Sequence, residues 1–305
     1  MGISCNWYIL NVKQMDVNSA QVCAEQLMAV LQWSNNVTEN FELIPSDGSP
    51  SQQSKNEFSS TLFNHQPSLN AVDQLYQDCY RILLPACAWM VDELAALLSK
   101  TPTMVTHLQI GRSLIETLAR IWWLRDPRID IATRVARFFT CSLDVVYEGR
   151  KLELTDDAKS MWSERISMEV RKAQNAGLSP RRDKFDNVIG FESSTMYEKT
   201  TLVKTYLTDL DINFGDVWYR LMSGAVHLNE ASILTRTEMQ PIRDTNHMKL
   251  VGVIPSDEII KVTAIAIRGF VRAVSGYIDD FGHASINFES IDCEFASPIF
   301  ALLNI

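Results

Sequence analysis

The sequence Thr103-Met-Val-Thr-His-Leu-Gln-Ile-Gly-Arg-Ser-Leu-Ile-Glu-Thr-Leu-Ala-Arg-Ile-Trp-Trp-Leu124 carries apolar residues around most of an α-helix. Its polar residues fall on one narrow stripe, and apolar side chains occupy both sides of that stripe. Such a helix needs neighbouring elements on several sides to cover its surface, so we expect it to lie centrally. The Asp126-Pro127 turn predicts its end. The stripe consists of Gln109, Arg112, Ser113, Glu116 and Arg120.

Helical periodicity continues on both sides of this segment, whereas strand-like alternation is scarce. Pro85 predicts a kink because proline lacks a backbone donor, and Asp130 and Thr155 are expected helix N-caps. Residues 181–194 resemble a mobile connection, and 236–255 a short β-hairpin or an irregular excursion. The sequence therefore predicts an all-α helical bundle. The other expected helices cover residues 19–33, 68–99, 130–149, 155–177, 196–207, 214–228 and 257–278.

A polar stretch over residues 45–54, with two prolines and a glycine, is the best candidate for a boundary in the chain. It separates an N-terminal appendage and linker, residues 1–60, from the helical bundle, residues 61–282. Residues 283–305 form a C-terminal tail rich in Phe and Ile. This tail has the composition to dock either on the bundle or on a partner.

The composition is that of a globular, intracellular protein. Among 305 residues, 46% are apolar, and 37 acidic residues exceed 28 basic ones to give a net charge of −9. This balance argues against coating of duplex DNA, which depends on clustered Lys and Arg. The most apolar window, 259–278, carries its charged residues on one helical stripe, which favours a core helix over a membrane span. The N-terminus lacks a signal-peptide pattern, so we expect a cytoplasmic protein without membrane contact.

The cysteines are scattered, with no Cys-x-x-Cys pair and no His at zinc-like spacing. We therefore expect reduced, mostly buried thiols and no metal site. Glycine-rich phosphate loops, the His-Glu-x-x-His motif and the Gly-x-Ser-x-Gly motif are missing from the sequence, so no cofactor is predicted. The six cysteines are Cys5, Cys23, Cys79, Cys87, Cys141 and Cys293.

The helix expected over 214–228 carries chemistry-bearing residues on one face. Arg220 and His227 lie about 10 Å apart along its axis and about 20° apart in direction. A guanidinium and an imidazole so placed can engage one phosphodiester, the first stabilising charge and the second moving a proton. The polar face, spanning roughly 60°, consists of Asp216, Arg220, Ser223 and His227. The expected buried face consists of Phe214, Val217, Trp218, Leu221 and Ala225.

The Arg-x6-His spacing in Tyr219-Arg-Leu-Met-Ser-Gly-Ala-Val-His227 resembles the motif of the HEPN superfamily (higher eukaryotes and prokaryotes nucleotide-binding domains). The segment Gly111–Pro127, followed by Arg134-Val-Ala-Arg137, is similar to uncharacterised bacterial helical proteins related to that group. This resemblance implies a helical bundle that acts as a metal-independent ribonuclease, with its site formed across a homodimer. RNA or a nucleotide is the implied ligand. Arg220 would clamp a phosphate, and His227 would be the general acid–base.

The polar stripe of the central helix offers a second candidate cluster. Arg112, Glu116 and Arg120 are spaced so that Glu116 can pair with both arginines. If the stripe is partly buried, Glu116 is a positioned acceptor that orients His227 or an arginine, and we count it among the catalytic candidates. The alternative is an exposed ladder of ion pairs, which would contribute little to stability.

Arginines are concentrated between residues 112 and 137. This segment contains six arginines, three acidic residues and no lysine. Arginine suits bidentate contacts to phosphate or carboxylate, so the segment predicts a confined anion site. The alternative is salt bridging to nearby acids such as Asp144 and Glu148. The substrate-binding candidates are Arg112, Arg120, Arg134, Arg137 and Ser223.

Two functions from different classes follow. The first is an HEPN-like protein that binds or cleaves RNA or binds a nucleotide, and the candidate enzyme is a metal-independent endoribonuclease. The second is a non-catalytic helical module that senses a ligand or binds a protein, which the acidic net charge and Leu221 directly after Arg220 favour. A third reading, an enzyme that uses the arginines to bind a carboxylate substrate, stays open.

Overall fold

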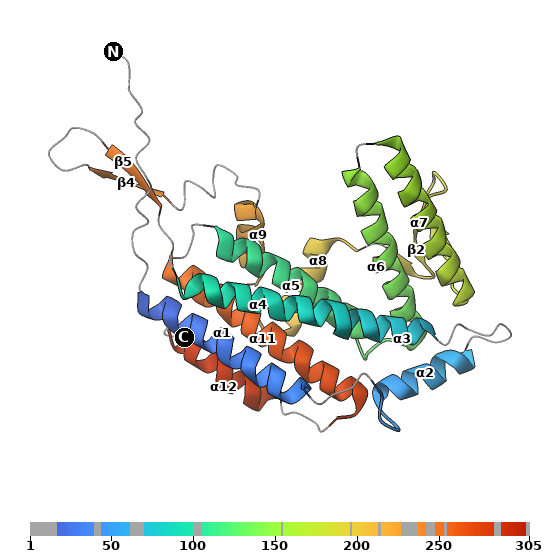
Figure 1. Ribbon diagram of the computed structural model, residues 1–305, viewed down its shortest axis with the longest axis horizontal. Helices are drawn as coiled ribbons and strands as arrows, with labels where there is room; N and C mark the ends of the chain where they lie inside the picture. Colours follow the sequence, from blue (N-terminus) through green and yellow to red (C-terminus); the bar gives the residue numbers. More distant parts are fainter. Residues whose placement is uncertain are drawn as a thin grey trace, which may run out of the picture.

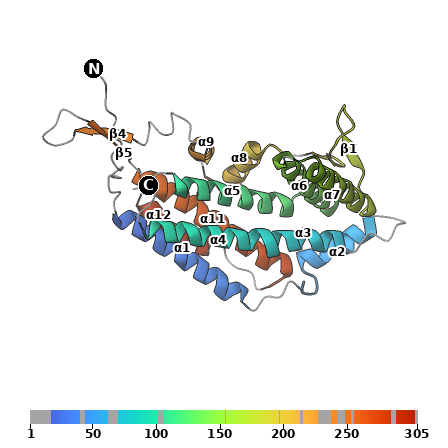
Figure 2. The same ribbon diagram turned by 45° about the horizontal axis from the view of Figure 1, so that its top comes forward.

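In the computed structural model, the described residues form a bundle of helices, which confirms the all-α prediction (Figure 1). Helix α5 (Thr106–Arg125) lies at its centre. Figure 2 shows α5 between α8 (Lys199–Asp209) and α9 (Gly215–Val226) on one side and α4 (Leu84–Leu98) and α11 (Ser256–Phe281) on the other. The described residues are 17–39, 44–61, 70–100, 105–153, 155–195, 197–212, 215–226, 237–241, 248–252, 255–283 and 288–302.

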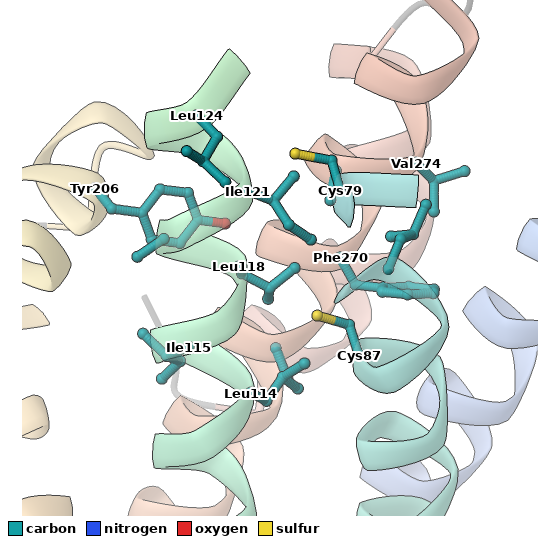
Figure 3. Close-up of a cluster of buried hydrophobic side chains, with 14 of the residues drawn as sticks. Cys79, Cys87, Leu114, Ile115, Leu118, Ile121, Leu124, Tyr206, Phe270 and Val274 are labelled. Atoms are coloured by element: carbon teal, nitrogen blue, oxygen red, sulfur yellow. The ribbon is translucent and has the colours of Figure 1, made fainter. Parts of the chain in front are cut away.

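The hydrophobic core forms where α4, α8 and α11 converge on α5 (Figure 3). Helix α11 approaches closely at Gly269, where an added Cβ would lie 2.9 Å from Leu118 Cδ1 and 2.7 Å from the Tyr206 hydroxyl oxygen. The missing side chain of Gly269 is therefore what lets Leu118 and Tyr206 pack against the α11 backbone. Figure 3 labels core residues Cys79, Cys87, Leu114, Ile115, Leu118, Ile121, Leu124, Tyr206, Phe270 and Val274.

The helix expected over 68–99 is interrupted by a π-helical turn. It divides into α3 (Asn70–Gln77), the π turn η1 (Asp78–Leu83) and α4. The Leu84 N–H donates to the Cys79 carbonyl five residues back, which is the π pattern. Pro85 follows directly, at the start of α4. Because proline has no backbone N–H, one carbonyl of the preceding turn receives no helical hydrogen bond from it. Pro85 thus indicates the place of the irregularity, and its form is a widened turn.

The first and the last described helices both contribute to the bundle. Helix α1 (Val17–Thr38) packs against α4 and α11, and its Leu27 is fully buried. The predicted appendage over residues 1–60 therefore does not describe α1, because periodicity predicts a helix but not its packing partners. Helix α12 (Phe288–Ala301) packs on α11 and α1 and buries Phe295, so this part of the tail docks on the body (Figure 1).

Two further helices, α6 (Ile131–Leu152) and α7 (Asp156–Asn175), pack side by side (Figure 1). The Asp130 carboxylate accepts from the Thr133 N–H at 2.7 Å, and the Thr155 hydroxyl accepts from the Ala158 N–H at 3.3 Å. Both predicted N-caps are therefore confirmed, because each supplies an acceptor to an unpaired donor of the first turn.

Residues 181–194, expected to be a connection, contribute to a small antiparallel sheet in the order β1–β2–β3. Phe191 is buried, and the sheet packs against α6. The expectation is wrong because strands of two to four residues are too short for alternation to be recognised. The strands are β1 (Pro180–Arg182), β2 (Val188–Phe191) and β3 (Ser194–Thr195).

The hairpin alternative for residues 236–255 is supported by β4 (Thr237–Pro241) and β5 (Met248–Gly252), which pair antiparallel. Helix α2 (Pro50–Thr61) begins within the stretch expected to be a linker. Ser54 on α2 is buried, so the C-terminal part of the expected linker, residues 50–54, belongs to the packed structure.

A buried ion pair joins α5 to α11. Arg125 Nε donates to Asp280 Oδ2 at 2.8 Å, and its Nη2 donates to the Gly276 carbonyl at 2.9 Å. The Tyr80 hydroxyl donates to the same carboxylate oxygen. Burial alone would lower the pKa of Arg125, but Asp280 and Tyr80 hold it well above its ordinary value. The guanidinium is therefore charged, and its carboxylate partner neutralises it inside the protein.

The most apolar window of the sequence, 259–278, lies within α11. Ile265 and Phe270 in this window are fully buried among the neighbouring helices. None of the helices in the described part of the chain combines the length and the apolarity needed to cross a bilayer.

Cysteines among the described residues are free thiols. Cys23, Cys79, Cys87 and Cys141 are buried on α1, η1, α4 and α6, whereas Cys293 on α12 is exposed. Burial raises the pKa of Cys23 and Cys141 to about 11, and that of the other two buried thiols further. The expected buried thiols are confirmed at these four positions.

Candidate functional site

A polar cluster holds α9 against α5, and we call Arg112, Glu116 and Tyr219 the α5–α9 cluster. Glu116 Oε1 accepts from Arg112 Nε at 2.7 Å and from the Tyr219 hydroxyl at 2.9 Å. The Arg112 guanidinium lies 5.8 Å from the centre of the Tyr219 ring. One carboxylate oxygen therefore joins two residues of α5 to a residue 103 positions later in the chain.

The electrostatics of the α5–α9 cluster keep Arg112 charged and Tyr219 neutral. Burial lowers the pKa of Arg112, but Glu116 and Tyr219 raise it above its ordinary value overall. Burial and the Glu116 carboxylate raise the pKa of Tyr219, and Arg112 offsets only part of this. Tyr219 therefore remains a hydrogen-bond donor at neutral pH.

Helix α9 presents a different face to the core from the one expected. Tyr219 is only 2% exposed and Met222 is fully buried, whereas Val217 is 61% exposed. The expectation that Val217 is buried is wrong, because Tyr219 combines an apolar ring with a hydroxyl that has an acceptor in Glu116. Leu221 is half-buried against the core, and the side chains of Phe214, Trp218 and Ala225 lie outside the described residues.

The three site candidates on this helix have different positions. Arg220 follows Tyr219 directly and is exposed, and Ser223 is half-buried one turn further on. His227 lies outside the described residues, just after the end of α9 at Val226. The structure thus places Arg220 on the same helix as Tyr219, with an exposed side chain, while the role of His227 stays a prediction.

Glu116 pairs with only one of its two expected arginines. Arg112 takes the carboxylate, and Arg120 points instead toward Asp78 on η1, with 3.8 Å between Arg120 Nη2 and Asp78 Oδ2. Arg112, Glu116 and Arg120 are all partly buried, with side chains 18–25% exposed, so the ladder alternative does not hold here.

The arginines between 112 and 137 do not converge on one anion site. Arg134 is buried, with Nη2 donating to the Ser54 hydroxyl at 3.1 Å and Nη1 to the Tyr76 hydroxyl at 3.3 Å. Arg137 donates to the Trp123 carbonyl at 2.8 Å and stacks 4.7 Å from its ring centre. These arginines serve separate contacts, which corrects the prediction of a shared pocket.

Salt bridging explains several of these arginines, but the acids differ from those expected. Asp126 lies 2.7 Å from Arg128 Nε and 3.8 Å from Arg137 Nη1. Glu148, an expected partner, pairs with Lys151 instead. Asp126 lies in the connection between α5 and α6, inside the arginine-rich segment, and spacing alone does not show which arginines it pairs with.

Sequence reasoning missed two polar residues of these clusters, Tyr219 and Asp78. Tyr219 directly precedes Arg220. Its hydroxyl, a hydrogen-bond donor on an otherwise apolar ring, is the sequence signal that could have indicated its role. Asp78 lies on the π turn, and Pro85 is the residue of the sequence that indicates an irregularity there. Across the described residues, no group of three or more His, Cys, Asp or Glu is placed to hold a metal ion.

Comparison with protein-family models, with curated proteins and with solved structures gives no match for this chain.

Removing the Tyr219 hydroxyl is expected to loosen α9. Tyr219→Phe should lower the free energy of unfolding by about 1.5 kcal/mol, because it deletes a hydrogen bond to a charged, partly buried group. The difference should shrink above pH 10. The raised pKa of Tyr219 keeps its proton in the folded state when the unfolded state loses it, so this residue's contribution falls as pH rises. Urea unfolding at neutral and alkaline pH measures both effects, and equal stability at neutral pH would contradict the first.

Proposed function

We propose that the exposed face of α9, which carries Val217 and Arg220, binds RNA or a nucleotide, with Arg220 as the phosphate contact, and that the protein is a metal-independent endoribonuclease. The observation that supports this most is the pair of hydrogen bonds at Glu116 Oε1. They fix α9 against α5 through Tyr219, and the next residue, Arg220, is exposed beside that anchor. An arginine on a fixed helix can meet a phosphate with little loss of backbone freedom, and its planar guanidinium matches the phosphate oxygens.

The role of Glu116 in this proposal is positioning. Its Oε1 already accepts from Arg112 and Tyr219, so it holds the helix that carries Arg220. Arg112 lies in the same cluster and donates to the same carboxylate oxygen. The resemblance to the HEPN superfamily supplies the reaction and the homodimer, which the proposal adopts.

The proposed reaction is an internal transfer on the ribose. His227 takes the proton of the 2′-hydroxyl, and the 2′ oxygen forms a bond to phosphorus. The bond from phosphorus to the 5′ oxygen breaks, and that oxygen receives the proton that His227 has taken up, so His227 returns to its starting state. Arg220 stabilises charge on the two non-bridging oxygens. The products are a 2′,3′-cyclic phosphate and a 5′-hydroxyl, so no water enters this step.

Cleavage of end-labelled single-stranded RNA in the presence of EDTA tests the proposal. We expect His227→Ala to lower the cleavage rate about 100-fold or more, as for loss of a general acid–base. Arg220→Ala should also lower the cleavage rate strongly. Arg171→Ala removes an exposed arginine on α7 and is the matched control, with an unchanged rate. Full activity in His227→Ala, or no cleavage by the folded wild-type protein, would overturn the nuclease proposal.

RNA binding and cleavage are separable in the same experiment. Retention of RNA by the wild-type protein should fall steeply as salt rises, because phosphate contacts release counterions. Arg220→Ala should reduce that salt dependence, and the mass in solution should be that of a homodimer. If RNA is not retained even at low salt, the exposed face of α9, with Val217 and Arg220, is better explained as a protein-binding surface.

A further inference from the structure

A second polar site lies about one helical turn further along α5 from Glu116, at Arg120. A cleft of about 550 Å³ opens between η1, α5, α6 and α7. Its volume lies within the range of pockets for small molecules. Arg120 belongs to its lining, together with Asp78 and Arg81 from η1 and Glu169 and Lys172 from α7.

Arg120 is the least satisfied charged group in this cleft. Its side chain is 18% exposed, and its Nε is buried with no hydrogen-bond partner in the described part of the chain. The nearest carboxylate oxygen, on Asp78, lies 3.8 Å from Nη2, beyond hydrogen-bond distance. A buried donor without an acceptor costs free energy, and a ligand whose acceptor oxygen reached Nε would remove that cost.

The walls of the cleft are apolar and unusually exposed. Ile82 is 59% and Val145 is 52% exposed, and Phe138 and Val146 lie next to them in the lining. Apolar side chains that face a cleft around a charged residue fit a ligand with an apolar body and one charged end.

The π turn η1 builds one side of this cleft. It contributes Asp78, Arg81 and Ile82, which a regular helix would present at different angles. Turns of this kind occur frequently at functional sites. Burial and the nearby Glu169 raise the pKa of Asp78, and Arg120 only partly opposes this. The cleft therefore holds charged groups at some cost to the folded protein.

We propose that this cleft binds a small monocarboxylate with an apolar body, its carboxylate on the Arg120 guanidinium and its body against Ile82, Phe138 and Val145. The planar fork of an arginine matches a carboxylate in a bidentate contact. A phosphate fits less well, because Asp78 and Glu169 leave only a small excess of positive charge among the charged side chains of the lining. The site is independent of the proposed RNA site.

Titration calorimetry with benzoate and with octanoate tests this binding, with inorganic phosphate as the comparison at equal ionic strength. We expect at least one carboxylate to bind the wild-type protein at millimolar concentration or below, and more tightly than phosphate. Arg120→Met should weaken that carboxylate at least tenfold. Arg171→Met removes an exposed arginine of α7 that is not part of the cleft lining, and it should leave the dissociation constant unchanged. The comparison of benzoate with octanoate shows whether the cleft prefers a compact ring or an extended alkyl group.

Val145→Asp keeps the test decisive if Arg120→Met does not fold. Val145 is half-exposed, so the substitution leaves the core intact while it adds a negative charge to the cleft wall. It should abolish carboxylate binding. The proposal is overturned if neither carboxylate binds, if phosphate binds more tightly, or if both cleft variants bind like the wild type. RNA cleavage measured on Val145→Asp should be unchanged, so failure of either proposal is seen separately.

Discussion

Replacing Arg125 with methionine is expected to lower the free energy of unfolding by about 3–5 kcal/mol, because it leaves a buried carboxylate without its partner. Asp280 would keep only the Tyr80 hydroxyl as a donor among the contacts described above. The Gly276 carbonyl would also lose the Arg125 Nη2 donor. Urea unfolding followed by circular dichroism measures the change, and Arg171→Met on the exposed face of α7 is the control.

A second variant separates the charge effect from simple loss of packing. Arg125→Met combined with Asp280→Leu removes both charges, and apolar replacement of a whole buried pair is often close to neutral. The double variant should therefore be more stable than Arg125→Met alone, although the Tyr80 hydroxyl loses its acceptor. If the double variant were the less stable one, an unpaired carboxylate would not explain the defect.

Truncation of Leu118 to alanine should have an effect of similar size, about 2–5 kcal/mol, because it opens a cavity in the core. Leu118 is almost fully buried where α5 meets α8 and α11 (Figure 3). Leu152→Ala removes a side chain that is 81% exposed, and this control should change stability by less than about 0.5 kcal/mol. Chemical unfolding at a single pH compares the two.

The same contact gives a cavity-filling test. Gly269→Ala alone should destabilise by about 1–3 kcal/mol, because the new methyl would collide with Leu118 and the Tyr206 hydroxyl. In the double variant with Leu118→Ala, part of that collision disappears. The double variant should therefore be more stable than the sum of the two changes predicts. Strict additivity would show that the two residues do not share this space.

Local signals in the sequence were sufficient for most helices. Asp130 and Thr155 cap their helices as expected, since a cap depends on residues three positions away. The apolar circumference of 103–124 also predicted the central place of α5. The π turn before Pro85 was predictable in position but not in form, because one missing donor permits either a kink or a widened turn.

The candidate site depended on contacts that local spacing does not encode. Glu116 takes its second donor from Tyr219, and Arg125 takes its carboxylate from Asp280, 155 positions later. An arginine stripe on one helix can reach several neighbours, so its charge predicts pairing but not the partners. The predicted rotation of α9 is wrong at Val217 for the same reason, because a tyrosine with a distant acceptor can be buried.

The buried thiols on α1, η1, α4 and α6 make local unfolding of these elements measurable by chemical labelling. An alkylating reagent reacts with a thiolate that solvent reaches, and burial suppresses both conditions in the folded state. The rate at which each cysteine is labelled therefore reports how often its own helix leaves the bundle. Exposed Cys293 supplies the unprotected reference within the same molecule. Mass spectrometry of one labelled sample thus ranks four helices by local stability, without any substitution.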